Sequence, residues 1–223
     1  MAIVGAESTG KTTLAVALER ALARDFGLHC VRVGEYLREW CDVNDRTPRP
    51  DEQAPLAREQ QRRIDAAAAT PGVEVVLCDT TPLMTAVYSE LLFDDCSLYA
   101  FAAEAQWGVD LTLLTALDLP WVADGLQRDG PHVRAPVDAA VRARLLDWGL
   151  RWSLVSGVGG ARTDAALDAL RPLLRRRARH AGAGSGLFRR LMEASDQPQR
   201  PAWRCELCDD PACEHLGRDV GEG

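Results

Sequence analysis

The chain has 223 residues, of which 47% are hydrophobic and 26% charged, and its formal net charge is -7. This length and apolar content suit one α/β domain with a full core and exclude two large domains. The acidic balance argues against a nucleic-acid partner, and no stretch approaches the roughly 20 apolar residues of a membrane span. We therefore expect a cytoplasmic protein with reduced thiols, a small-molecule substrate, and no membrane or nucleic-acid partner. The oligomeric state stays open.

The first expected element is a short strand at Ala2–Val4, followed by a glycine-rich segment and a helical pattern from Leu14 to Leu22. The segment Gly5–Thr12, GAESTGKT, matches G-x-x-x-x-G-K-[ST] in full. A strand, loop and helix in this order bring backbone N–H groups and a helix N-terminus to one polyphosphate. The sequence thus predicts an ATP site formed by Gly5, Glu7, Ser8, Thr9, Gly10, Lys11, Thr12 and Thr13.

Two side chains of this segment have specific expected roles. Lys11 would contact the β- and γ-phosphates as a point charge, and the Thr12 hydroxyl would complete the oxygen shell of a Mg²⁺ ion. The predicted cofactors are therefore ATP and Mg²⁺.

Apolar runs alternate with helical segments along the rest of the chain, which predicts an α/β fold with a five-stranded parallel sheet covered by helices on both faces. A polar loop is expected at Val43–Pro50, and then a helix capped by Asp51 that runs to about Ala69. The domain is expected to span residues 1–180, followed by a linker and tail at 181–223. The four further strands are expected at Cys30–Val33, Val73–Cys78, Leu111–Ala116 and Trp152–Ser156.

Ligands of open parallel sheets bind at the carboxyl ends of the strands, so the residues there are the site candidates. Glu35 follows the second strand, with Arg38 one helical turn later; they would reach a substrate hydroxyl, or Glu35 would only complement a helix dipole. Asp79 ends the third strand, where a buried carboxylate would hold Mg²⁺ or take a proton, or else cap the helix that begins at Pro82.

The loops after the last two strands carry arginines. The segment Asp118–Arg134 has glycines near both ends and predicts a mobile lid over the phosphates, with Arg128 inside it. The segment Ser156–Arg162 predicts a loop beside the adenine, with Arg162 along the ring as a further ATP-binding residue; a simple glycine turn is the alternative.

Five ordered motifs in residues 1–175 together resemble the ribosylnicotinamide kinase domain of bifunctional NAD-biosynthesis regulators, P-loop NTPases that also carry an adenylyltransferase domain. They are Gly5–Thr12, GEYxRE at 34–39, Asp79-Thr80, DLTLL at 110–114 and PWxxDGxxR at 120–128. The resemblance implies a nucleoside-monophosphate-kinase-like fold and transfer of the ATP γ-phosphoryl group to the 5′-hydroxyl of nicotinamide riboside. It implies catalytic roles for Lys11, Glu35, Asp79 and Arg128, a magnesium shell from Thr12 and Asp79, and substrate binding by Arg38 and Asp124. Tyr36 and Tyr88 are expected to complete the acceptor pocket with Glu35 and Arg38.

The tail has a second group of candidate ligands: Cys205, Cys208, Cys213 and His215. A C-x-x-C pair followed by a cysteine and a histidine can supply a tetrahedral Zn²⁺ site. A redox-sensitive or disordered cysteine tail is the alternative.

The sequence thus favours an ATP-dependent kinase for nicotinamide riboside. Two alternatives stay open. One is a P-loop ATPase that acts as a regulatory switch, and the other is a kinase for a different nucleoside or small alcohol.

Overall fold

The computed structural model describes residues 1–122 and 130–180 of the chain, the side chains of 178–180 excepted. Its contacts divide the chain into two units, Met1–Leu174 and Arg175–Gly223. The sheet and the candidate site described below belong to the first unit. The division into a domain at 1–180 and a tail remains a prediction.

The first unit is built on a five-stranded sheet in the order β2-β3-β1-β4-β5, and every neighbouring pair is parallel. The predicted α/β class is therefore confirmed, and β1 and β2 have the predicted bounds. The strands are β1 (Ala2–Val4), β2 (Cys30–Val33), β3 (Val75–Asp79), β4 (Thr112–Thr115) and β5 (Trp152–Val155).

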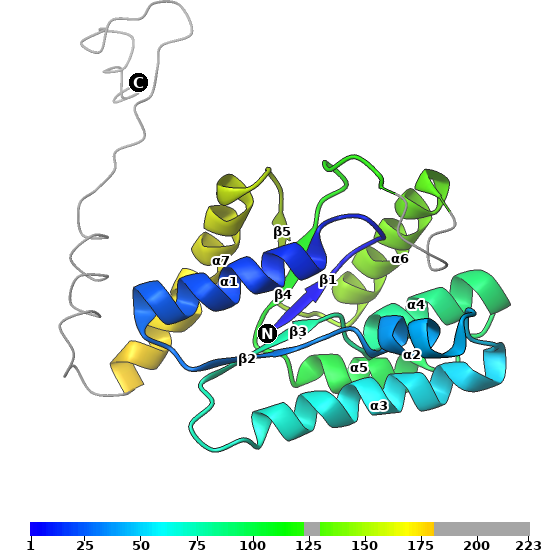
Figure 1. The fold of residues 1–223 in the computed structure, drawn as a ribbon, viewed down its shortest axis with the longest axis horizontal. Helices are drawn as coiled ribbons and strands as arrows, with labels where there is room; N and C mark the ends of the chain where they lie inside the picture. Colours follow the sequence, from blue (N-terminus) through cyan, green and yellow to red (C-terminus); the bar gives the residue numbers. More distant parts are fainter. Residues whose placement is uncertain (123–129, 181–223) are drawn as a thin grey trace, which may run out of the picture. The chain divides into compact units, whose positions relative to one another are not determined.

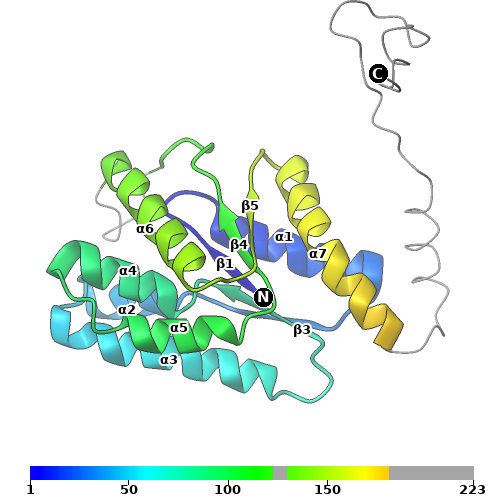
Figure 2. The ribbon, with the colours of Figure 1, turned by 180° about the vertical axis from the view of Figure 1, so that it is seen from behind.

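Helices connect the strands and cover both faces of the sheet (Figures 1 and 2). A short 3₁₀ helix, η2 (Pro131–Val133), precedes α6. The helices are α1 (Lys11–Phe26), α2 (Tyr36–Asn44), α3 (Pro50–Ala68), α4 (Pro82–Phe93), α5 (Tyr99–Trp107), α6 (Arg134–Asp147) and α7 (Gly160–His180). None of the helices in the described part of the chain has the length and apolar character needed to cross a membrane.

The central strands are buried on both faces, which explains why they read as continuous apolar runs. Ile3 packs with α1 and α7 in one core cluster, which includes Leu18 and Leu170. Its neighbours Ala2 and Val4 point to the opposite face and pack with α4 and α6 in a second cluster. The short β1 thus lies at the centre of the core. Its packing on both faces fixes where the phosphate-binding loop, Gly5–Thr12 (the P-loop), begins.

The segment between β2 and β3 contains the expected helix, but with a different N-cap. Two helices fill it, and α3 begins at Pro50 with Arg49 as its N-cap, so the prediction that Asp51 is the cap was wrong. Proline suits the first helical position because it lacks the N–H that would go unpaired there. The Glu52 carboxylate accepts a hydrogen bond from the Arg49 N–H at 2.8 Å, which closes the first turn.

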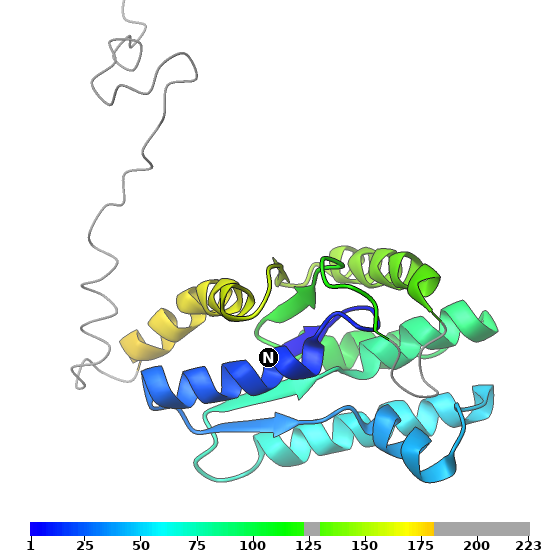
Figure 3. The same cartoon turned by 45° about the horizontal axis from the view of Figure 1, so that its top comes forward.

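The strand ends place the candidate residues at one edge of the sheet. Figure 3 shows β2 running directly into α2, and β1 into the loop before α1. Glu35 is the N-cap of α2 and Asp79 is the last residue of β3, so both stand at carboxyl ends of neighbouring strands. Thr81, not Asp79, is the N-cap of α4, and Pro82 occupies its first turn.

Candidate active site

The loop between β1 and α1 depends on two glycines. Gly5 has a φ of +147° and Gly10 a φ of +74°, values that favour glycine. A Cβ atom on Gly5 would lie 2.2 Å from Oγ1 of Thr115 on β4, so only glycine lets the backbone pass this hydroxyl. Gly10 caps α1, whose first N–H groups and dipole favour a bound phosphate.

Hydrogen bonds within the loop hold its shape. The Thr9 hydroxyl donates to the carbonyl of Ala6 at 2.7 Å and lies 2.7 Å from the hydroxyl of Thr115. The Lys11 ammonium also donates to the Ala6 carbonyl, at 2.9 Å. The loop is therefore organised by its own side chains and by β4, which is the preorganisation that a phosphate-binding loop needs.

The loop after β4 contacts the P-loop directly. The Ser8 hydroxyl donates to the carbonyl of Val122 at 3.2 Å and accepts from the Val122 N–H at 2.8 Å. This is the start of the segment for which a lid was predicted. Arg128 and Asp124 belong to the same segment but lie outside the described residues, so their roles remain predictions.

Arg162 occupies a different place from the expected one. Its side chain is buried beneath the P-loop, with a 2.7 Å ion pair to Asp118 and a 2.9 Å hydrogen bond to the carbonyl of Gly157. It also donates to the carbonyls of Thr9 and Ala116. Because the guanidinium group is committed to these partners, the structure supports a role in holding the loops together, not one of lying along an adenine ring.

A cavity of about 740 Å³ extends from the P-loop to α2, α3 and α4. The P-loop side supplies residues 7–13, so all of the predicted ATP-binding residues except Gly5 and Arg162 face it. The opposite side includes Glu35, Arg38, Gln53, Asp79 and Tyr88. The cavity has room for a phosphoryl donor and a small acceptor side by side, since ligand pockets fall between about 300 and 1,000 Å³.

Charged groups of both signs converge on this cavity. Burial lowers the pKa of the Lys11 ammonium, although Glu35 and Asp79 both oppose the shift. Burial also raises the pKa of the Glu35 carboxyl; Lys11 opposes this shift and Asp79 adds to it. These mutual effects show that the three side chains share one electrostatic environment, a pattern typical of catalytic sites.

Asp79 is the better fitted of the two carboxylates for a metal ion. Its side chain is 2% exposed, and its Oδ1 atom has no hydrogen-bond partner among the residues that the structure describes. A buried carboxylate oxygen without a hydrogen-bond donor lowers the stability of the fold unless a bound ligand or metal ion interacts with it. Asp79 and the Thr12 hydroxyl, which also faces the cavity, are therefore suited to hold Mg²⁺ with phosphate oxygens and water.

The predicted acceptor residues divide into two groups. Glu35 and Arg38 face the cavity, with a 3.7 Å ion pair between them, and Tyr88 lines it from α4. Tyr36 is not among the lining residues: the guanidinium carbon of Arg63 lies 4.2 Å from the centre of its ring, so the prediction that Tyr36 lines the acceptor pocket was wrong.

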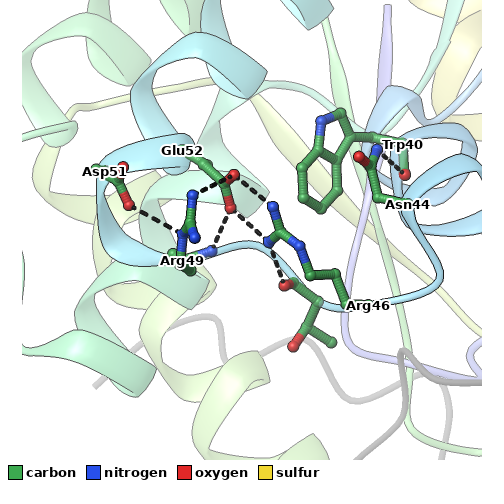
Figure 4. Close-up of polar contacts among 7 residues, drawn as sticks. Trp40, Asn44, Arg46, Arg49, Asp51 and Glu52 are labelled. Carbon is green, nitrogen blue, oxygen red and sulfur yellow. Dashed lines mark hydrogen bonds and ion pairs between the residues drawn. The ribbon is translucent and has the colours of Figure 1, made fainter.

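A cluster at the start of α3 fixes another wall of the cavity (Figure 4). Arg46 donates to both carboxylate oxygens of Glu52, at 2.7 and 2.6 Å, and to the carbonyl of Thr47 at 3.1 Å. Its guanidinium carbon lies 4.7 Å from the centre of the Trp40 ring. Thr47 and Pro48 line the cavity, so this cluster sets the shape of the wall that they form. We refer to Trp40, Arg46 and Glu52 as the Arg46 clamp.

Sequence patterns gave no signal for the Arg46 clamp or for Gln53, which lines the cavity from α3. The clamp joins residues of two helices and their loop, and a glutamine within a helix looks like any other polar residue. Arg46 and Glu52 lie six residues apart across a helix start, which is not a helical pairing distance.

The predicted zinc ligands Cys205, Cys208, Cys213 and His215 lie outside the described residues, so the zinc site stays a prediction. Within the described residues, four cysteines are free thiols and no group of three or more His, Cys, Asp or Glu side chains is placed to hold a metal ion. A nucleotide-bound Mg²⁺ does not require such a group, because it takes most of its ligands from phosphate and water.

Solved structures support the fold. The chain is similar to NadR protein in complex with NAD and AMP-PNP, with a TM-score of 0.62 and 21% identity over 77% of this chain and 48% of that chain. NadR in complex with NR gives a TM-score of 0.63 with the same identity and coverage, so the chain spans about half the length of these NadR chains. Thymidylate kinase from Ehrlichia chaffeensis gives a TM-score of 0.53 at 17% identity over 77% of this chain and 96% of that chain.

A search of curated protein sequences found no match. A family model described as an AAA domain matches residues 1–162, from β1 to the start of α7. This range contains the P-loop and all the described residues that line the cavity. The chain therefore belongs to the AAA domain family, with a P-loop kinase-like fold.

Proposed function

We propose that the protein is an ATP-dependent small-molecule kinase, and that its acceptor is nicotinamide riboside, phosphorylated on the 5′-hydroxyl. The observation that carries the proposal is the single cavity in which the P-loop, Lys11, Glu35 and Asp79 meet. A protein that only hydrolyses ATP has no need of a walled space beyond the γ-phosphate. Here the cavity extends past the P-loop and is lined by side chains of α2, α3 and α4.

The proposed division of labour follows from position. The P-loop N–H groups and Lys11 bind the donor phosphates and neutralise charge as the phosphoryl group moves. Thr12 and Asp79 would hold Mg²⁺, which would further neutralise the charge on the phosphate oxygens. Glu35 lies at the end of β2 next to the acceptor space and accepts the proton of the attacking hydroxyl.

The elevated pKa of Glu35 suits this role, because a carboxylate that holds a proton more strongly is a better base. Arg38 pairs with Glu35 and orients its carboxylate toward the acceptor. The choice of nicotinamide riboside rests on the five motifs of the sequence and on the structural likeness to NadR in complex with NR.

The test is a screen of purified protein with ATP and Mg²⁺ against a panel of ribosides and small alcohols, with ADP release and product mass as readouts. We expect phosphorylation of nicotinamide riboside well above that of other nucleosides. Turnover of a different nucleoside would reject the named acceptor and keep the enzyme class. ADP release that no acceptor stimulates would instead support the ATPase switch.

A further inference from the structure

Two glutamines of α3, Gln53 and Gln60, are both 3% exposed. They lie two helical turns apart and so on the same face of the helix. A buried side-chain amide is costly unless its donor and acceptor are both paired, so each glutamine needs partners. The two differ in how this need is met.

Gln60 is paired by the backbone around Glu35. Its Oε1 atom accepts a hydrogen bond from the N–H of Tyr36 at 2.8 Å, and its Nε2 group donates to the carbonyl of Gly34 at 3.1 Å. The amide thus connects the residues on either side of Glu35. Gln60 is a positioning residue that fixes the start of α2, and with it the direction of the Glu35 carboxylate.

Gln53 has no such partner. Its side chain lines the cavity, and none of the described residues forms a hydrogen bond with its amide group. The same cavity includes Cys41 of α2 and Thr47 and Pro48 of the loop before α3, which offer mostly apolar surface. The Gln53 amide is therefore a polar group of the cavity wall that no described residue pairs. Precisely placed polar groups in a pocket wall fix the orientation of a bound ligand.

We propose that Gln53 determines acceptor specificity by binding an amide group of the acceptor. A primary or ring amide presents one donor next to one acceptor, which matches the Gln53 side chain in a pair of hydrogen bonds. This inference rests on the proposed kinase function and names the part of the acceptor that the cavity recognises. For nicotinamide riboside that part is the ring carboxamide; for another nucleoside it is the amide edge of the base.

The test compares the wild-type protein with Gln53→Leu on two acceptors, nicotinamide riboside and the pyridinium riboside that lacks the carboxamide. Leucine keeps most of the side-chain volume and removes both polar atoms. We expect Gln53→Leu to raise the KM for nicotinamide riboside by about 10- to 100-fold, because loss of a buried polar match weakens binding by this order. The KM for ATP should change less than about threefold, since the P-loop holds the donor.

The riboside without the carboxamide completes a comparison of two proteins with two acceptors, like a double-mutant cycle. Its KM with the wild-type protein should be about as high as the KM of nicotinamide riboside with Gln53→Leu. The substitution Gln53→Leu should raise the KM of this riboside little further. Gln60→Leu is the matched control from the same face of α3. It should lower kcat on both acceptors alike, because it disturbs Glu35 and not the acceptor ring.

Equal KM changes for the two acceptors in Gln53→Leu would overturn the inference and leave the kinase function intact. If Gln53→Leu unfolds at a lower temperature than the assay allows, Gln53→Glu is the second variant. Glutamate keeps an oxygen that accepts a hydrogen bond and loses the N–H donor. Gln53→Glu should therefore raise the KM for nicotinamide riboside more than the KM for the riboside without the carboxamide. Equal changes of the two KM values would overturn the inference here too. A wild-type protein that phosphorylates no riboside would overturn the proposed function first, and this inference with it.

Discussion

The guanidinium group of Arg162 donates a hydrogen bond to the main-chain carbonyl of Thr9 over 2.8 Å. The contact joins the first turn of α7 to the middle of the P-loop, 153 residues away in the sequence. The same side chain pairs with Asp118 after β4, so one buried arginine holds three separate segments of the nucleotide site.

Arg162→Gln should therefore weaken ATP binding and lower the unfolding temperature. The substitution leaves buried carbonyls of the loops without a donor and the partly exposed Asp118 without its ion pair, and an unpaired buried polar group costs about 1–3 kcal/mol. Nucleotide binding by calorimetry and thermal unfolding are the measurements. Arg171→Gln on the same helix is the control, because the Arg171 side chain is 56% exposed and its only ion pair in the described part of the chain is with Asp168. Similar effects of both substitutions would contradict the positioning role.

Lys11→Ala should reduce phosphoryl transfer on the order of 100-fold or more, because it removes the ammonium group that neutralises charge on the transferring phosphoryl group. Steady-state turnover with saturating ATP and acceptor is the measurement. Arg24→Ala removes a cation from the other end of α1, where among the described residues it pairs with its neighbour Asp25, and should leave turnover unchanged. Turnover of Lys11→Ala within threefold of wild type would reject the mechanism.

Glu35→Gln should abolish most acceptor phosphorylation while ATP affinity stays nearly constant, since the donor is held by the P-loop and the base acts on the acceptor. Single-turnover rates and equilibrium ATP binding separate the two effects. Glu59→Gln on α3 is the control, because its carboxylate is bound by Arg62 at 2.6 Å and Glu59 does not line the cavity. A parallel loss of ATP affinity in Glu35→Gln would place Glu35 in the metal shell instead.

The part of this site that the sequence predicts is the part whose contacts join residues close together in the sequence. The P-loop, β1 and the start of α1 are local features, and the motif at Gly5–Thr12 identifies them from adjacent residues alone. Glu35 and Asp79 were found because parallel strands end at one edge of the sheet. The partners of Arg162 could not be found this way, because its contacts depend on how α7 packs beneath the P-loop and no local pattern encodes that packing.

The Arg46 clamp should control acceptor binding and acid stability together. Hydrogen bonds from Arg46 and the Arg49 N–H lower the pKa of Glu52 from 4.5 to about 2 in the folded protein. A carboxyl whose folded pKa is lowered contributes stability above its unfolded pKa, and this contribution is lost as the pH falls toward the folded pKa. The difference in unfolding temperature between wild type and Glu52→Gln should be largest above pH 4.5 and vanish near pH 2.

Glu52→Gln should also raise the acceptor KM at neutral pH, because the wall at Thr47 and Pro48 loses its support. Glu59→Gln is the matched control. Arg62 and Arg63 lower the pKa of Glu59 likewise to about 2, but Glu59 does not line the cavity. It should show the same acid dependence of stability with little change in acceptor KM. A change of KM in both variants alike would contradict a specific role for the clamp.

A chain that ends at His180 should fold, bind ATP and transfer phosphate, because every described residue of the proposed site precedes that position. Metal analysis tests the tail separately. If Cys205, Cys208, Cys213 and His215 bind zinc, the full chain carries about one equivalent and the shortened chain none, since a structural zinc site uses four protein ligands. If full-length protein contains no zinc after growth with added zinc, the tail does not bind zinc.

The two hydrogen bonds between Ser8 and Val122 give the protein an optical reporter. Trp121 is the residue next to Val122, so its indole follows the backbone that the P-loop serine holds. We expect a phosphate bound to the loop to compete for the Ser8 hydroxyl and so to change the surroundings of this indole. The emission of Trp121, isolated by replacing the other tryptophans with phenylalanine, then records nucleotide arrival in real time without a label.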